Sequence, residues 1–169
     1  MIVVEHFIKA IVETIPEIQL NPKLKALPKF HWGDEHELNR YIALKKAESY
    51  PLIWLLPDSD KYEGWNGKKA TRDCSFIIAT RETRKELFND QRYIKTFDLV
   101  LNPLTRYLIH GLQTSSITDR MNDGWTITKY PNYSADSDKD GTIDIWDAVK
   151  LEMNVRFFGE VKCLKQIQY

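Results

Sequence analysis

The sequence has little of what marks disulfide-rich, membrane-spanning or nucleic-acid-binding proteins. Its two cysteines, Cys74 and Cys163, lie far apart without C-x-x-C spacing, so we expect buried free thiols. No apolar run approaches the length that crosses a membrane, and charged residues interrupt the first segment too often for a signal peptide. Basic and acidic residues number 24 each, which gives a formal net charge of +0. We therefore expect no membrane and no sequence-specific nucleic-acid partner.

The chain also lacks the common catalytic fingerprints. It contains no G-x-S-x-G, P-loop, H-E-x-x-H or dinucleotide-binding motif. The two cysteines lie on apolar faces of expected strands, where a thiol is a poor nucleophile. We therefore expect a protein that is not an enzyme and requires no cofactor.

What is present is a pattern of helices and strands. Apolar residues at helical spacing predict a helix over 2–15, ended by Pro16, and a long helix over 94–113, interrupted by Pro103. Asp34 and Glu37 match a capping box and predict a second helix that reaches about residue 49. Residues 16–33 lie between the helix over 2–15 and the helix that begins with the capping box. They contain three prolines, so we expect this segment to cross the surface in extended or turn conformations.

Four further segments read as strands. Residues 52–56 form a short apolar run typical of a strand buried on both faces, and residues 70–80 and 124–131 alternate. Strict alternation over 149–157 is the strongest strand signal in the chain. The expected class is α+β, with a mixed or antiparallel sheet of about four to five strands covered on one face by the N-terminal helix and the long central helix. We expect one domain over 1–169, with an insertion at about 16–49 and a projecting hairpin at about 124–158.

An acidic loop, DSDKDGTIDIWD over residues 136–147, has the spacing of an EF-hand calcium loop. Calcium takes six to eight oxygen ligands, and a glycine at the sixth place, here Gly141, allows the sharp turn. The candidate ligands are the carboxylates of five aspartates and the carbonyl of one threonine: Asp136, Asp138, Asp140, Asp144, Asp147 and Thr142. The alternative is a solvated tip of the hairpin that joins 124–131 to 147–158.

The loop also resembles the dockerin repeat, which carries a similar run of aspartates, a glycine and a branched apolar residue. Dockerins usually pair two such repeats and are secreted, whereas this chain has one. A working EF-hand also needs a helix leaving the loop, while the alternation after Val149 favours a strand. Calcium is thus the candidate ion, and the loop gives an alternative function, a calcium-dependent protein-binding module.

The order of elements resembles the tail-terminator and tail-completion proteins of tailed bacteriophages. The likeness spans about two thirds of the chain and lies in four segments: ESYPLIWLLP (48–57), CSFIIAT (74–80), FDLVLNPLTRYLIHGL (97–112) and IDIWDAVKLEMNVRF (143–157). Two features depart from the family pattern: the segment 16–49 is longer than the usual connection, and the acidic tip is not part of it. Either feature could instead belong to a neck or connector ring protein of the same fold.

This resemblance implies a structural protein of the virion, made in the host cytoplasm. It implies a homo-oligomeric ring, usually a hexamer, at the head-proximal end of the tail tube. There the ring stops tube growth and contacts tail-tube and head-completion or connector proteins, and no active site is implied. Independently, five tryptophans and eight tyrosines exceed what a small core needs, and aromatic residues are favoured at protein interfaces.

Overall fold

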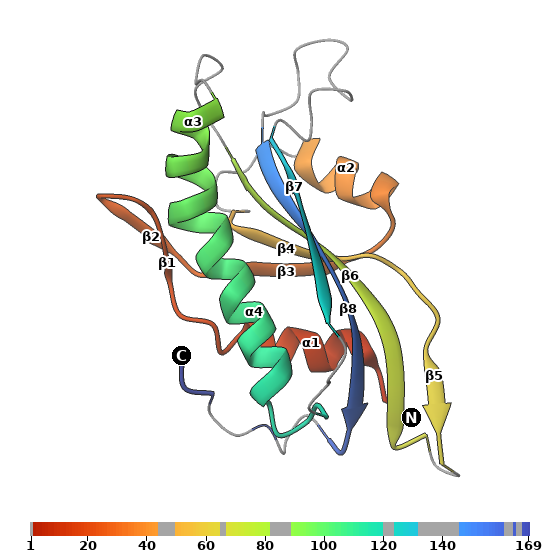
Figure 1. Cartoon of the computed structure of the whole chain (residues 1–169). Coiled ribbons are helices and arrows are strands. Elements are labelled where there is room, and N and C mark those ends of the chain that lie inside the picture. The colour runs from red at the N-terminus through yellow and green to blue at the C-terminus, as the bar shows by residue number, and fades with distance from the viewer. Residues whose placement is uncertain are drawn as a thin grey trace.

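The protein is a twisted sheet with helices on both faces. The computed structural model describes residues 2–43, 50–64, 67–81, 89–119, 124–131, 146–160, 164 and 167–169. A long helical rod runs along one face of the sheet and a shorter helix, α2, lies on the other (Figure 1). The expected α+β class is confirmed.

The main sheet has six described strands in the order β3-β4-β6-β8-β7, with β5 paired to β6. Their bounds are β3 (Lys29–Trp32), β4 (Leu52–Leu55), β5 (Lys61–Glu63), β6 (Lys69–Arg81), β7 (Trp125–Tyr130) and β8 (Trp146–Phe158). All pairs are antiparallel except β3 with β4. The expected pairing of the segments 124–131 and 147–158 is present as β7 with β8.

The centre of the sheet is the long pair formed by β6 and β8. Thirteen residues of each strand pair, from Lys69 opposite Phe158 to Arg81 opposite Trp146. The period-two pattern that predicted β8 arises because alternate residues face the helical rod, where Val149, Leu151 and their successors are buried. Cys74 lies in β6 and is a buried free thiol, as expected.

The proline-rich segment 16–33 forms more regular structure than its sequence suggests. A small hairpin, β1 (Ile18–Asn21) with β2 (Leu24–Ala26), packs against the helical rod, and β3 joins the main sheet beside β4. The extended conformation was expected for these residues, whereas the pairing of their strands was not. Each of these strands has only three or four residues, so its conformation depends on a partner that the local sequence does not reveal.

The first helix, α1 (Val4–Val12), follows the expected span closely. Its buried face consists of Val4, Phe7, Ile8, Ile11 and Val12. This face packs against the helical rod and the same side of the sheet, in the larger of two hydrophobic clusters.

The helical rod changes hydrogen-bond pattern along its length. It comprises α3 (Asn89–Arg92), the π-helical segment η2 (Tyr93–Leu101) and α4 (Asn102–Thr114). The N–H of Asn102 bonds to the carbonyl of Phe97, five residues earlier. Pro103, which has no N–H, stands in the first turn of α4, where that loss is tolerated. The interruption expected at Pro103 is therefore a change from π- to α-helix at residue 102, within one rod (Figure 1).

The second helix, α2 (Glu35–Ala43), begins with the predicted capping box. The Glu37 N–H donates to Asp34 Oδ1 at 2.8 Å, and the Asp34 N–H donates to Glu37 Oε2 at 3.1 Å. Leu38 and Ile42 of this helix bury against β4, β6 and β8. The N-terminal helix and the long helix cover one face of the sheet, as expected, and α2 covers part of the other face as well.

No helix in the described part of the chain is long and apolar enough to span a membrane.

Candidate functional site

Most of the acidic loop lies outside the described residues. This applies to the candidate ligands Asp136, Asp138, Asp140, Thr142 and Asp144, whereas Asp147 is described and is the second residue of β8. Within the described ranges, no group of three or more histidine, cysteine, aspartate or glutamate side chains is arranged to hold a metal ion.

Asp147 is fully buried between the sheet and the helical rod. Its Oδ2 accepts a hydrogen bond from Thr96 Oγ1 at 2.7 Å, and its Oδ1 lies 3.8 Å from Nη1 of Arg92. Arg92 is also buried. A cation held by the acidic loop could use Asp147 only if this carboxylate left both Thr96 and Arg92.

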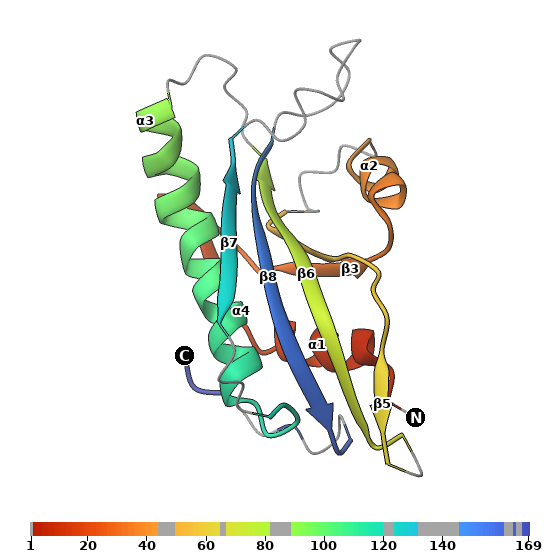
Figure 2. The same ribbon diagram turned by 45° about the vertical axis from the view of Figure 1, so that its right-hand side comes forward.

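One exposed apolar surface of the sheet lies on its edge strand β7. Among the described strands β7 has one neighbour, β8, and it stands beside the helical rod (Figure 2). Trp125 and Ile127 pair with Met153 and Leu151 of β8, so they share the face that the rod covers elsewhere. Yet Trp125 is 46% exposed and Ile127 is 43% exposed. We call these two residues the edge surface.

The one charged residue of β7 is turned back onto the molecule. Lys129 Nζ lies 5.2 Å from the centre of the Tyr93 ring and 5.6 Å from that of Phe97, which are themselves stacked. A lysine that points outward from an edge strand discourages pairing with other chains, and cation–π contact holds this one inward. The outer side of the edge surface is left without a charged side chain of its own strand.

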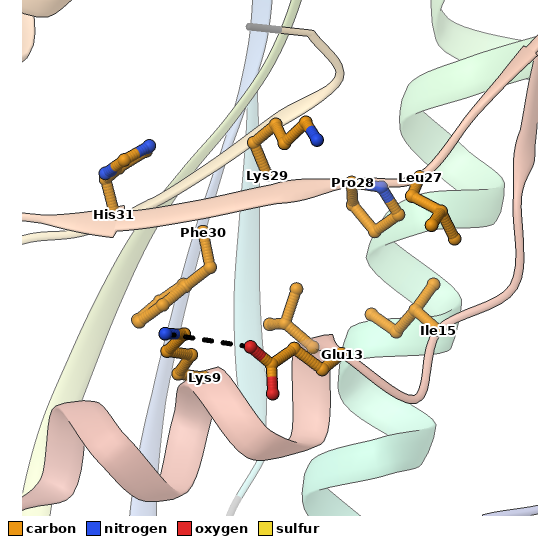
Figure 3. Close-up of a pocket in the computed structure, with 9 residues that line it drawn as sticks. Lys9, Glu13, Ile15, Leu27, Pro28, Lys29, Phe30 and His31 are labelled. Carbon is orange, nitrogen blue, oxygen red and sulfur yellow. Dashed lines mark ion pairs between the residues drawn. The ribbon is translucent and has the colours of Figure 1, made fainter.

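A second apolar surface lies at the other end of the sheet, between α1 and the opposite edge strand β3. A groove of about 300 Å³ opens there, with Phe30 projecting from β3 toward α1 (Figure 3). Its apolar lining is Val12, Ile15, Leu27, Pro28 and Phe30. Leu27 is 52% exposed at the rim, and the Trp32 ring lies beside that of Phe30, tilted by 32° with the ring centres 5.8 Å apart. We call this site the α1–β3 groove.

The charges at the groove are largely paired or directed away from it. Lys9 Nζ lies 3.7 Å from Glu13 Oε1 across one turn of α1 (Figure 3). Lys29 and His31 project from the side of β3 opposite to Phe30, as strand alternation requires. Burial lowers the pKa of His31, and the positive charges of Lys29 and Lys9 lower it further. The groove is thus suited to an uncharged apolar guest.

A third cluster, around Arg72 of β6, links the segment before β5 to α1 and does not form an open site. The buried Arg72 donates from Nη1 to Glu5 Oε1 at 2.6 Å and from Nη2 to the Asp58 carbonyl at 3.0 Å, and its Nε lies 3.5 Å from Asp60 Oδ1. The Tyr62 hydroxyl bonds to Asp60 at 3.1 Å. Arg72 already forms ion pairs with two carboxylates and a hydrogen bond to a carbonyl, so its role is structural.

A scan of the chain against protein-family models found no matching family, and a search of curated proteins found no significant relative.

The sequence pointed to only part of these surfaces. The excess of aromatic residues suggested an interface without saying where it lies, and two tryptophans, Trp32 and Trp125, are exposed. Two others, Trp54 and Trp146, are buried in the cluster beneath α2. The apolar run 52–56 predicted the burial of Trp54, whereas nothing in the local sequence distinguishes Trp146 from the two exposed tryptophans, since its burial depends on which neighbours the sheet brings to β8.

Proposed function

We propose that this protein is a ring-forming structural subunit of a bacteriophage tail, which ends the tail tube or joins the tail to the head. The observation that carries the proposal is the presence of exposed apolar surfaces at both edges of one sheet, on a fold that has the α+β class and element order from which the resemblance was drawn. A subunit in a closed ring needs two different contact surfaces, one for each neighbour.

The proposal also accounts for the character of the side chains at these surfaces. Trp125 at one edge and Trp32 with Leu27 at the other are large apolar groups about half exposed. Tryptophan is among the residues that contribute most to binding at protein interfaces. A monomer in water gains nothing from exposing them, whereas a ring would bury them.

The test is whether the protein forms a ring and whether that ring binds tubes. Light scattering would give the mass of the purified protein, and negative-stain electron microscopy would show its shape, alone and mixed with phage tail tubes. We expect rings with a central opening at the ends of tubes. A protein that neither assembles alone nor binds tube ends would contradict the proposal.

The alternative function, a calcium-dependent protein-binding module, is tested separately by calorimetry with calcium. Binding that is lost in Asp140→Ala would support it, and no heat at millimolar calcium would remove it. The position of Asp147 weighs against a complete set of loop ligands, because its carboxylate already binds Thr96 and Arg92.

A further inference from the structure

We propose that the ring closes head to tail, with Trp125 of one copy inserting into the α1–β3 groove of the next. This inference rests on the proposed ring function and assigns its contact surfaces. The edge surface and the groove lie at β7 and β3, the two ends of the strand order β3-β4-β6-β8-β7. Two different patches on one chain that fit each other make a heterologous contact, which gives a ring where the rotation between copies closes.

The size of the groove fits one aromatic side chain. Its volume of about 300 Å³ is at the lower limit for small-molecule pockets, which leaves room for a single bulky group. Trp125 can supply that group, because nearly half of its surface is open to solvent in the single chain. Ile127, two residues further along the same face of β7, would then lie against the exposed Leu27 at the rim.

The charges of the two surfaces are also compatible. Neither Trp125 nor Ile127 is charged, and the ammonium of Lys129 on the same strand lies over the rings of Tyr93 and Phe97. At the groove, Lys9 and Glu13 pair with each other, so an uncharged guest leaves neither without a partner. The indole N–H of Trp125 is a donor with an apolar body, and the Glu13 carboxylate at the rim is an acceptor.

Two substitutions separate the two halves of the contact. Trp125→Glu removes the guest and leaves the groove intact, while Leu27→Glu places a charge at the rim and leaves the guest intact. Each alone is expected to weaken self-association about thirtyfold or more, the usual effect of losing a central interface residue. Ile94→Glu changes an apolar residue that is 61% exposed on the helical rod and serves as the matched control.

The decisive experiment mixes the two variants. An equimolar mixture of Trp125→Glu and Leu27→Glu retains one good groove and one good tryptophan, so light scattering should show dimers and no rings. Circular dichroism spectra should show that all three variants keep the wild-type secondary structure, although the two variants that do not assemble lose the stabilisation that assembly gives. A contact between identical patches would give no such rescue, and that result would overturn the proposal.

The outcomes distinguish this inference from the ring function itself. If the wild type forms rings, alone or on tubes, and Trp125→Glu or Leu27→Glu forms them equally well, the contact lies elsewhere and the ring function stands. If the wild type forms no ring and binds no tube, both proposals fail. Rings lost in both variants, kept in Ile94→Glu and replaced by dimers in the mixture would support the inference.

Discussion

Arg92 and Asp147 form a buried ion pair that joins the helical rod to the beginning of the central strand β8, with 3.8 Å between Nη1 and Oδ1. Both side chains are at most 2% exposed. Thr96, one turn further along the rod, completes the site by donating its hydroxyl to the same carboxylate. The last residue of the acidic loop is thereby fixed inside the protein.

Removing the charge at Asp147 should strongly destabilise the protein. Asp147→Asn leaves the guanidinium of Arg92 buried without its counter-charge, which costs about 3–5 kcal/mol in comparable sites. Urea unfolding followed by circular dichroism measures the change. Glu152→Gln, in the same strand but paired with Lys150 at the surface, should cost at most about 1 kcal/mol. Equal losses in both variants would contradict a special role for the buried pair.

The pair should be replaceable by apolar residues. A double variant, Arg92→Leu with Asp147→Leu, removes both charges, and such replacements are often neutral or stabilising. It should therefore recover much of the stability lost in Asp147→Asn, although the Thr96 hydroxyl then loses one of its acceptors. The same unfolding measurement applies, and a double variant less stable than Asp147→Asn would show that the pair is needed for the fold.

The Glu5–Arg72 pair should give the protein a pH-dependent stability. Burial by itself raises the pKa of Glu5, but the hydrogen bond and charge of Arg72 outweigh it and hold the pKa below its usual 4.5. The folded state therefore binds this proton less readily than the unfolded state. The contribution of Glu5 is full above pH 4.5 and is lost as the pH falls through the lower folded value.

Glu5→Gln tests this by removing the titrating group. At neutral pH the variant should be less stable by about 1–2 kcal/mol, and this difference should shrink in acid. Unfolding free energies between pH 3 and 7 give the comparison, with the exposed Glu13→Gln as control. A difference between wild type and Glu5→Gln that does not change with pH would rule out the linkage.

His31 should titrate below the usual histidine range, and nearby lysines should tune it. Burial is the main cause of its lowered pKa, followed by the charges of Lys29 and Lys9. Lys29→Gln should raise the pKa of His31 toward 6.5 without restoring it fully. Nuclear magnetic resonance titration of the imidazole protons measures it. Lys23→Gln, at an exposed turn, should leave the titration unchanged.

Gly111 in α4 should resist substitution because α1 and Tyr169 pack closely over it. A Cβ at this position would lie 2.7 Å from Ile11 Cγ2 and 3.0 Å from the Tyr169 hydroxyl. Ile11 is fully buried and has little room to move, so overpacking of about 1–3 kcal/mol should outweigh the gain of about 1 kcal/mol in helix propensity. Thermal unfolding should show Gly111→Ala to be destabilised. A Cβ added at Gly124 would have no atom within 4 Å apart from its chain neighbours, so Gly124→Ala should melt close to the wild type.

Features whose signal lies within one segment were predictable. The capping box of α2 depends on two residues three positions apart, and the structure contains both of its hydrogen bonds. The spans of α1 and β8 follow from periodic burial within a single element. The position of the helix change before Pro103 follows from the missing N–H of proline.

Features that depend on distant partners were not predictable. β3 is a strand because its backbone pairs with β4 and the Lys29 N–H donates to the Pro51 carbonyl. Its own four residues, which follow a proline, carry no clear strand signal. Arg92 lies in a charged stretch but is buried because Asp147, far along the chain, meets it.

The sequence alone determined the helices, the central strands and the absence of net charge, because hydrophobic periodicity and capping act over a few residues. Only the tertiary structure decided that β7 and β3 form the two edges of one sheet, that Trp125 is exposed while Trp146 is buried, and that Asp147 bonds to Thr96 and pairs with Arg92. Burial and pairing are properties of the neighbours that folding brings together, and those neighbours are distant in the chain.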